Sequence, residues 1–430
     1  MYLDEIHIRN LRVFADARAA FQYPGRVRGK GGRVLDFPNL NLILGNNGAG
    51  KTSLLRAIAL AALGPLAEKF SPYMLVRRAG GAKRTKAASA GDADRLQIDA
   101  TFQKTWQDRG QKKPDGQLAK LESSCAVARY GDEESVVPKA ADDPDRAGAP
   151  RSRWRPIFEQ NSPAFLTVGY GATRRVDTDA NAATPAQKMK SSPLRHQRVQ
   201  SVFTEGYTLV QLGHWLPQLK SRNPGRYKQV CDRINDVLPD GIEFTGRTDR
   251  AGEYLFAQGG ALVPFAALSD GCRAFLGWVA DLLYHICFGC PSGVKLVDNC
   301  GMVLVDEVDL HLHPDWQRIV LPRLAKTFPR LQFIVTTHSP IVVGTLQREN
   351  LWVCEPGENG SILTQKEAGV QGLNSDQILL TEYFGLKSSR APAKEKELRR
   401  IAAAAERKVP GQAAAFLRSL ITPLEDKPAK

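Results

Sequence analysis

Two segments about 250 residues apart limit this chain more than any other feature. The first, residues 45–53, reads GNNGAGKTS, and the second, residues 301–314, reads GMVLVDEVDLHLHP. The first has the glycine spacing of a phosphate-binding loop, and the second contains an apolar run that ends in two carboxylates. Together they predict one ATP site in an α/β fold. Simple P-loop enzymes bring these segments much closer together, so the wide gap indicates a split ATPase body.

The first segment matches G-x-x-x-x-G-K-[ST], with Gly45, Gly50, Lys51 and Thr52 in the fixed positions. The preceding LNLILG suits a buried strand, and the following LLRAIALAAL favours a helix. Such a strand–turn–helix presents backbone N–H groups to phosphate oxygens. We expect Lys51 to reach the β- and γ-phosphates and the Thr52 hydroxyl to face Mg²⁺. The predicted nucleotide-contacting residues of this loop are Asn46, Asn47, Gly48, Ala49, Gly50, Lys51, Thr52 and Ser53.

The second segment predicts a buried strand, because the apolar residues 302–305 directly precede Asp306 and Glu307. We expect Asp306 to hold Mg²⁺ through water and Glu307 to polarise the attacking water. A strand that merely ends in solvated acids is the alternative, and the paired phosphate loop argues against it.

Two further motifs narrow the class of ATPase that this chain resembles. FIVTTHSP, residues 333–340, predicts another apolar strand, and its His338 stands where a γ-phosphate sensor is expected. ALSDGCRAFLGWVADLL begins at Ala267 and predicts a helix. With LSDG at residues 268–271, the chain resembles the ABC-type ATPases, whose signature motif is usually LSGG. Asp270 departs from the common glycine and matches a variant seen in soluble members.

The ABC resemblance implies an ATPase head with an antiparallel β-subdomain and a helical insertion. It also implies head-to-tail dimers, in which Ser269 and Gly271 of one subunit close on the γ-phosphate bound by the other. Asp309, just after the two carboxylates, is expected to cross this dimer interface. His311 and His313 form an H-x-H pair, for which we favour an interface role over metal binding.

A narrower resemblance rests on LSDG, on DEVDLHLHP (306–314) and on YGATR (170–174). These motifs are similar to AAA-type ABC ATPases of bacterial defence systems, including OLD-family, Septu PtuA and retron ATPases; RecF and SMC proteins are more distant. The resemblance covers roughly residues 1–60 and 160–350. It implies a regulatory ATPase that controls a separate nuclease or toxin effector. A RecF/SMC-like DNA repair ATPase, an ATP-gated scaffold for a toxin and the nucleotide-binding subunit of a membrane transporter remain alternatives.

The net charge of +14, from 59 Lys+Arg against 45 Asp+Glu, suggests a polyanionic partner such as nucleic acid. Basic residues gather in 77–86, 151–156, 188–198 and 394–408. Arginines around Trp154 could contact backbone phosphates and stack on bases. A solvated surface or an acidic protein partner explains the charge equally well.

Four parts are expected: an N-terminal ATPase lobe (1–175), a helical insertion (176–260), a C-terminal ATPase lobe (261–385) and a charged helical extension (386–430). No apolar run approaches the ~20 residues that cross a bilayer, and the start lacks a signal-peptide core. We therefore expect a cytoplasmic protein without a membrane partner. About 45 residues follow Gly385, too few for a Toprim nuclease, which places any nuclease on a separate chain.

Residues 96–107 and 124–130 are expected to pair as strands. Residues 208–219 and 226–238 show helical spacing, and 374–386 reads as a helix.

Arg174 or Arg175 could contact phosphate or the dimer partner, or pair with an acid. Gln160 is a weak candidate for the Q-loop glutamine. Cys287 and Cys290 have a C-x-x-C spacing but lack a second pair, so we favour reduced thiols over a metal or redox site.

Overall fold

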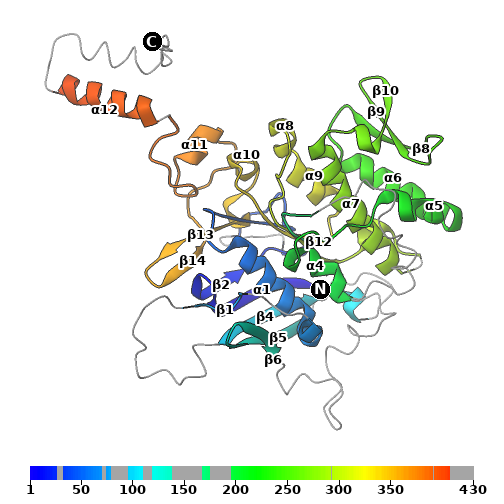
Figure 1. Cartoon of the computed structure of the whole chain (residues 1–430), viewed down its shortest axis with the longest axis horizontal. Helices are drawn as coiled ribbons and strands as arrows, with labels where there is room; N and C mark the ends of the chain where they lie inside the picture. Colours follow the sequence, from blue (N-terminus) through cyan, green and yellow to red (C-terminus); the bar gives the residue numbers. More distant parts are fainter. Residues whose placement is uncertain are drawn as a thin grey trace, which may run out of the picture. The chain divides into compact units, whose positions relative to one another are not determined.

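The chain divides into two compact units, Met1–Leu373 and Asn374–Lys430. Figure 1 shows the elements in sequence colours. The division into four functional parts remains a prediction. The computed structural model describes residues 1–26, 32–69, 74–78, 95–109, 119–137, 167–174, 195–291, 293–390 and 392–406.

A six-stranded sheet forms the centre of the first unit, in the order β14-β13-β3-β12-β11-β7. All neighbours are parallel except β13 and β14. Since β12 lies between β3 and β11, its carboxyl end falls between the ends of the two motif strands. The strands are β3 (Leu40–Gly45), β7 (Thr167–Tyr170), β11 (Gly301–Val305), β12 (Leu331–Thr336), β13 (Leu351–Gly357) and β14 (Gly360–Thr364).

A second, antiparallel sheet has the order β2-β1-β4-β5-β6 and is the predicted β-subdomain. The predicted pairing of 96–107 with 124–130 is confirmed, with Ile98 opposite Cys125. Helix α1 (Lys51–Leu63) contacts strands of both sheets and crosses the β-subdomain in Figure 1. It is apolar on nearly all sides, as a helix buried between two layers must be. The strands are β1 (Tyr2–Leu11), β2 (Phe14–Ala20), β4 (Arg95–Lys104), β5 (Ala119–Tyr130) and β6 (Glu133–Val137).

The insertion contains the two predicted helices, α5 (Leu212–Arg222) and α6 (Pro224–Val237). Asn223 caps α6 by accepting a hydrogen bond from the backbone N–H of Arg226 at 3.0 Å. An antiparallel sheet that the sequence reading missed follows these helices and runs past residue 260, the expected end of the insertion. It is formed by β8 (Ile242–Thr248), β9 (Tyr254–Gln258) and β10 (Ala261–Pro264). These strands are short and of mixed polarity, so they give no clear alternation.

Four helices complete the first unit around the central sheet, together with the short α4 (Gln200–Phe203). They are α7 (Asp270–Gly289), α8 (Pro314–Gln317), α9 (Val320–Thr327) and α10 (Pro340–Val343). Short 3₁₀ helices occupy Gly64–Lys69, Gln107–Arg109, Arg195–Val199, Phe265–Ala267, Leu296–Asp298 and Arg348–Asn350.

The second unit contains α11 (Ser375–Leu379) and α12 (Pro392–Glu406). The helix expected over residues 374–386 is therefore too long, because only its first turn is α-helical. Among the described helices, none is both long and apolar enough to cross a membrane.

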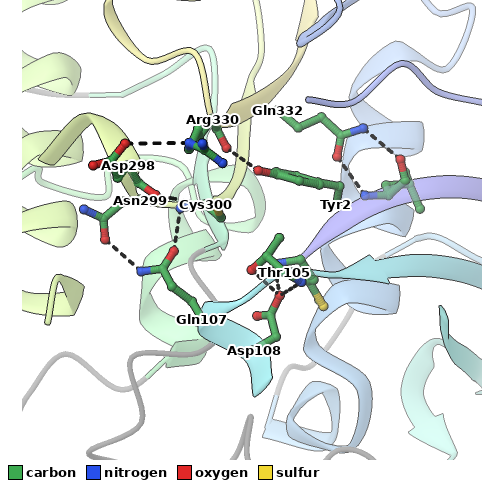
Figure 2. A network of polar contacts seen from close by, with 11 residues as sticks. Tyr2, Thr105, Gln107, Asp108, Asp298, Asn299, Cys300, Arg330 and Gln332 are labelled. Carbon is green, nitrogen blue, oxygen red and sulfur yellow. Dashed lines mark hydrogen bonds and ion pairs between the residues drawn. The ribbon is translucent and has the colours of Figure 1, made fainter. Parts of the chain in front are cut away.

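Buried polar contacts join the β-subdomain to the starts of β11 and β12 (Figure 2). The Gln332 side chain accepts from the backbone N–H of Leu3 at 2.7 Å and donates to its carbonyl at 2.8 Å. The Tyr2 hydroxyl donates to the Arg330 carbonyl at 2.8 Å. The Gln107 side chain donates to the Asn299 side chain at 2.8 Å. This network fixes the amino-terminal ends of β11 and β12, whereas the motif residues Asp306, Glu307 and His338 follow their carboxyl ends.

Candidate nucleotide site

The phosphate loop connects β3 to α1, and its glycines are required by its backbone. Gly45 and Gly50 have φ values of 145° and 103°, in the region that favours glycine. A Cβ on Gly45 would lie 2.5 Å from the Cys354 carbonyl oxygen, and one on Gly50 would lie 2.4 Å from the Phe14 ring. The strand–loop–helix predicted for residues 45–53 is thus present, with no space for other side chains at these two positions.

Lys51 begins α1 and points back across the loop. Its Nζ donates to the carbonyls of Gly45 at 2.8 Å and Asn46 at 3.1 Å. Burial lowers the pKa of Lys51, while the nearby carboxylates of Asp306 and Glu307 act in the opposite direction. A cation held at the mouth of a loop of N–H groups is suited to neutralising phosphate charge.

Thr52 and Asp306 meet although they are 254 positions apart, because Thr52 Oγ1 donates to Asp306 Oδ2 at 2.6 Å. Thr336 Oγ1 donates to the other carboxylate oxygen, Oδ1, at 2.5 Å. A hydroxyl and a buried carboxylate that converge are the hard oxygen donors that Mg²⁺ prefers. The pair therefore fits this ion, with Thr336 fixing the carboxylate from behind.

Glu307 follows at the end of β11 and has a left-handed backbone, with φ of 48°. Its N–H donates to Thr336 Oγ1 at 2.8 Å. Its half-buried carboxylate makes no hydrogen bond or ion pair with other described residues. A carboxylate left open beside a phosphate loop is available to orient a water molecule.

His338 follows β12, the strand between the phosphate loop and the carboxylates. Burial lowers its pKa, and the charge of Lys51 lowers it further, while Glu307 and Asp309 raise it. The ring is therefore mostly neutral near pH 7 and can both donate and accept a hydrogen bond.

Asp309 lies close to the same strand end, where Thr337 Oγ1 donates to Asp309 Oδ1. This contact fixes the side chain within its own chain. The role of Asp309 across a dimer interface remains a prediction.

The signature motif lies at the start of α7, as expected. Ser269 is exposed and caps the helix by accepting a hydrogen bond from the N–H of Cys272 at 3.4 Å. Ser269 and Gly271 line a cavity of about 820 Å³ with His311 and Trp316, and none of the described phosphate-loop residues lines it. One copy of the chain therefore does not join the signature motif to its own phosphate loop.

Gly271 packs against the segment that follows the two carboxylates. A Cβ on Gly271 would lie 2.2 Å from the backbone oxygen of His311, so no larger residue fits without a shift. The signature glycine thus serves the packing inside one chain as well as any contact with a second.

Sequence reasoning missed Arg12 and Thr336. Arg12, in the turn between β1 and β2, places Nη1 3.4 Å from Ser53 Oγ beside the phosphate loop. The basic turn in IRNLRVF could have signalled Arg12. Thr336 lies within FIVTTHSP, two residues before His338, but nothing in that motif shows that its hydroxyl reaches Asp306.

Arg174 donates to the backbone carbonyls of Gly171, Asp306 and Glu307, an arrangement that the sequence did not predict. Its contact with phosphate or a dimer partner remains a prediction.

The histidine and cysteine pairs form no metal site with the residues that the structure describes. Within the described ranges, no group of three or more His, Cys, Asp or Glu could hold a metal ion. His313 caps α8, accepting from the N–H of Asp315 at 3.4 Å. All seven cysteines are free thiols, and burial raises the pKa of Cys287 to about 12.

Several sequence expectations fall outside the described residues. These are residues 79–86 and 151–156, including Trp154, most of 188–198, the end of 394–408, Gln160 and Arg175.

Two family models match the chain. An AAA-domain model whose description refers to the AbiEii toxin and Type IV TA systems matches residues 171–344, and a second AAA-domain model matches residues 5–116. The first range contains the signature motif, Asp306 and His338, and the second contains the phosphate loop.

Two curated relatives share parts of the sequence. The chain is 42% identical over 112 residues to "Retron Ec83 probable ATPase" of Escherichia coli, a match that covers 26% of this chain and 20% of that protein. It is 28% identical over 228 residues to "Septu protein PtuA" of Bacillus mycoides (strain KBAB4), covering 52% of this chain and 30% of that protein. The matches therefore span less than a third of either relative's length.

Solved SMC heads are similar at low identity. The SMC head bound to the C-winged helix domain of ScpA is 14% identical with a TM-score of 0.45, covering 85% of this chain and 98% of that chain. The Thermotoga maritima SMC head domain is 16% identical with a TM-score of 0.43, covering 86% and 100%.

Proposed function

We propose that this chain, an AAA-type ATPase related to Septu and retron ATPases, binds Mg²⁺ and ATP at residues 45–53 and hydrolyses the γ-phosphate bond. The observation that carries the proposal is the 2.6 Å contact between Thr52 and Asp306, which joins the two motif segments into one site. Thr52 and Asp306 would hold Mg²⁺, which would neutralise phosphate charge. Lys51 binds the β- and γ-phosphates.

Glu307 acts as the residue that orients and polarises the attacking water, and His338 contacts the γ-phosphate. Glu307 suits this role because its carboxylate is open while its backbone is held. His338 suits contact with the γ-phosphate, because a mostly neutral imidazole can still donate a hydrogen bond to a phosphate oxygen near pH 7.

The catalytic unit is a head-to-tail homodimer, in which Ser269 and Gly271 of one copy complete the site of the other. Two observations support this arrangement: Ser269 is exposed, and the cavity beside it contains no phosphate-loop residue from the same chain. The start of α7 is also a helix N-terminus, which suits an anion such as the γ-phosphate bound by a second copy.

The ATPase cycle regulates a separate nuclease or toxin effector of a bacterial anti-phage defence system, in the cytoplasm. The support is the similarity to proteins named Septu PtuA and Retron Ec83 ATPase. The net charge of +14 makes nucleic acid a further partner and keeps a RecF/SMC-like role in DNA repair as the second candidate.

Two measurements test the proposal. ATP turnover is measured with and without double-stranded DNA at low and high salt. DNA stimulation that disappears at high salt supports a nucleic-acid partner, because phosphate contacts weaken steeply with salt. Indifference to DNA removes that partner and directs the search to a co-purifying effector.

The second measurement uses Glu307→Gln, which removes the water-orienting carboxylate but leaves the ATP contacts. We expect ATP to convert this variant into a stable dimer by light scattering, with turnover at least 100-fold below that of the parent chain, on the scale of lost general-base catalysis. Parent-like turnover by Glu307→Gln would refute the assignment.

A further inference from the structure

Arg174 occupies the turn that follows β7 and points at the end of β11. Its backbone N–H closes the turn on the Gly171 carbonyl at 3.3 Å. Its guanidinium Nη1 donates to the carbonyls of Gly171 at 3.0 Å and Asp306 at 2.7 Å, and Nη2 donates to the carbonyl of Glu307 at 3.0 Å. Two consecutive peptide carbonyls of the catalytic segment are therefore held by one rigid, forked side chain.

These contacts complete the hydrogen bonding of the backbone at Asp306 and Glu307. The Asp306 N–H donates to the Tyr170 carbonyl at 2.8 Å, and the Glu307 N–H donates to Thr336 Oγ1 at 2.8 Å. Both N–H groups are thus held by the strands on either side of β11. Arg174 holds the Asp306 carbonyl, and it shares the Glu307 carbonyl with the backbone N–H of Leu310, which donates to it at 3.1 Å. Every backbone polar group of the two residues has a partner.

The backbone needs this support because Glu307 has a φ of 48°, a conformation that costs free energy for any residue other than glycine. Such a conformation persists only when its surroundings fix it. Arg174 forms no ion pair with the carboxylates of Asp306 or Glu307 among the described residues, so its contacts act on the main chain. The Glu307 carboxylate is left open.

The turn that carries Arg174 is itself fixed to the phosphate-loop helix. The Gly171 N–H donates to Ser201 Oγ at 3.1 Å, and a Cβ on Gly171 would lie 2.3 Å from the Ser201 carbonyl oxygen. One residue further on, the Val202 carbonyl accepts from Arg56 Nε of α1 at 2.8 Å. Helix α4 therefore sets the position of this turn relative to α1.

We propose that Arg174 is a positioning residue for ATP hydrolysis, which sets the Glu307 carboxylate by holding the carbonyls of Asp306 and Glu307. The inference rests on the proposed function, because it assigns Glu307 the task of orienting water. It predicts that Arg174 affects the chemical step and leaves nucleotide binding largely unchanged, because among the described residues Arg174 makes no hydrogen bond or ion pair with residues 45–53.

The experiment compares Arg174→Met and Arg174→Lys with Arg226→Met as the matched control. Within the described part of the chain, the Arg226 side chain also donates to backbone carbonyls alone, those of Cys287, Cys290, Pro291 and Val294, at the far end of α7. For each variant, kcat is measured by steady-state turnover, the ATP dissociation constant by a fluorescent ATP analogue, and Tm by thermal unfolding.

For Arg174→Met we expect kcat to fall by about 100-fold, the scale of a 1 Å misplacement of a catalytic group. The ATP dissociation constant should change by less than about 3-fold, within ordinary uniform-binding effects. Arg174→Lys should remain impaired, because an ammonium cannot donate to both carbonyls in the same fork. Arg226→Met should keep parent-like kcat even if its Tm falls.

A double variant separates positioning from general damage. If Arg174 acts through Glu307, adding Arg174→Met to Glu307→Gln should lower turnover little beyond Glu307→Gln alone. Multiplicative losses, parent-like turnover by Arg174→Met or full rescue by Arg174→Lys would each overturn the inference. Parent-like turnover by Glu307→Gln itself would instead refute the proposed function, so the two failures are distinguishable.

Discussion

Thr336 donates a hydrogen bond from its hydroxyl to the Asp306 carboxylate at 2.5 Å, and the same oxygen accepts from the N–H of Glu307 at 2.8 Å. One side chain from the neighbouring strand therefore orients both acidic residues at the end of β11. The isosteric Thr336→Val should leave a buried carboxylate oxygen and a backbone N–H without partners, at a cost of about 1–3 kcal/mol each.

We expect Thr336→Val to lower ATP turnover by at least 10-fold and to raise the Mg²⁺ concentration needed for half-maximal turnover. Thr336→Ser keeps the hydroxyl and should keep most of the activity. Turnover across a magnesium titration measures both effects. Thr167→Val is the matched control, because the buried Thr167 hydroxyl has no hydrogen-bond partner among the described residues. Equal losses in both valine variants would contradict a specific role for Thr336.

The pKa of His338 should report the charge of Lys51. Burial and Lys51 both lower this pKa from its ordinary value of 6.5, so the native state disfavours the protonated ring. NMR titration of the nucleotide-free protein should therefore place the His338 midpoint below 6.5, and Lys51→Met should raise it. His338→Gln identifies the signal.

The sign of the stability effect follows from the same shift. Because the native pKa is depressed, any stability that His338 contributes is present above pH 6.5 and is lost as pH falls through the unfolded-state pKa towards the native one. A midpoint that does not move in Lys51→Met would show that the two side chains are not coupled.

Mixed dimers should recover activity that neither parent variant shows. Ser269→Arg blocks the signature surface, and Glu307→Gln disables hydrolysis in its own chain. In a heterodimer of the two, one site combines an intact Glu307 with an intact Ser269 from the other copy. An equal mixture should therefore reach about a quarter of parent activity if subunits pair at random in a two-fold dimer.

The turnover of the mixture, measured against each variant alone, checks this arrangement. Ser269→Thr, which keeps a hydroxyl at the helix cap, is the control that should retain activity. A mixture no more active than its components would argue against a site shared between copies.

Gln332 should be important for stability without touching the nucleotide site. Gln332→Leu leaves the N–H and carbonyl of Leu3 unpaired and also removes a 2.7 Å bond to the Gln22 carbonyl. Buried unpaired groups cost about 1–3 kcal/mol each, so we expect a Tm several degrees lower. Gln371→Leu, at an exposed bond to Asp36, is the control and should leave Tm nearly unchanged. Equal Tm values for the two variants would show that the Gln332 contacts add nothing.

Motif spacing could predict the strand–loop–helix at residues 45–53 and the helix that starts at the signature, because glycine geometry and a serine cap are local features. Apolar runs likewise predicted β11 and β12, and alternation predicted the pairing of β4 with β5. The two AAA-domain models match the ranges that contain the phosphate loop and the two carboxylates. The catalytic roles of Lys51, Glu307 and His338 remain predictions.

The unpredicted features depend on tertiary contacts. Thr336 acts on β11 from the end of β12 and Arg174 from the turn after β7, and no spacing in the sequence shows that their side chains reach Asp306 and Glu307. The sheet of β8, β9 and β10 is stabilised by an aromatic cluster of Phe244, Tyr254 and Phe256, which forms only when the strands pair. Such contacts join residues that are distant in the sequence, so local patterns do not predict them.

The lack of room for a side chain at Gly271 has a consequence for engineering. Because its Cα faces the backbone of His311, the first turn of α7 and residues 309–313 form one interlocked surface. A chimera that exchanges the signature helix with that of a relative would have to carry the loop as well. Designers who want to redirect the choice of partner should therefore treat these two segments, far apart in the chain, as a single exchangeable cassette.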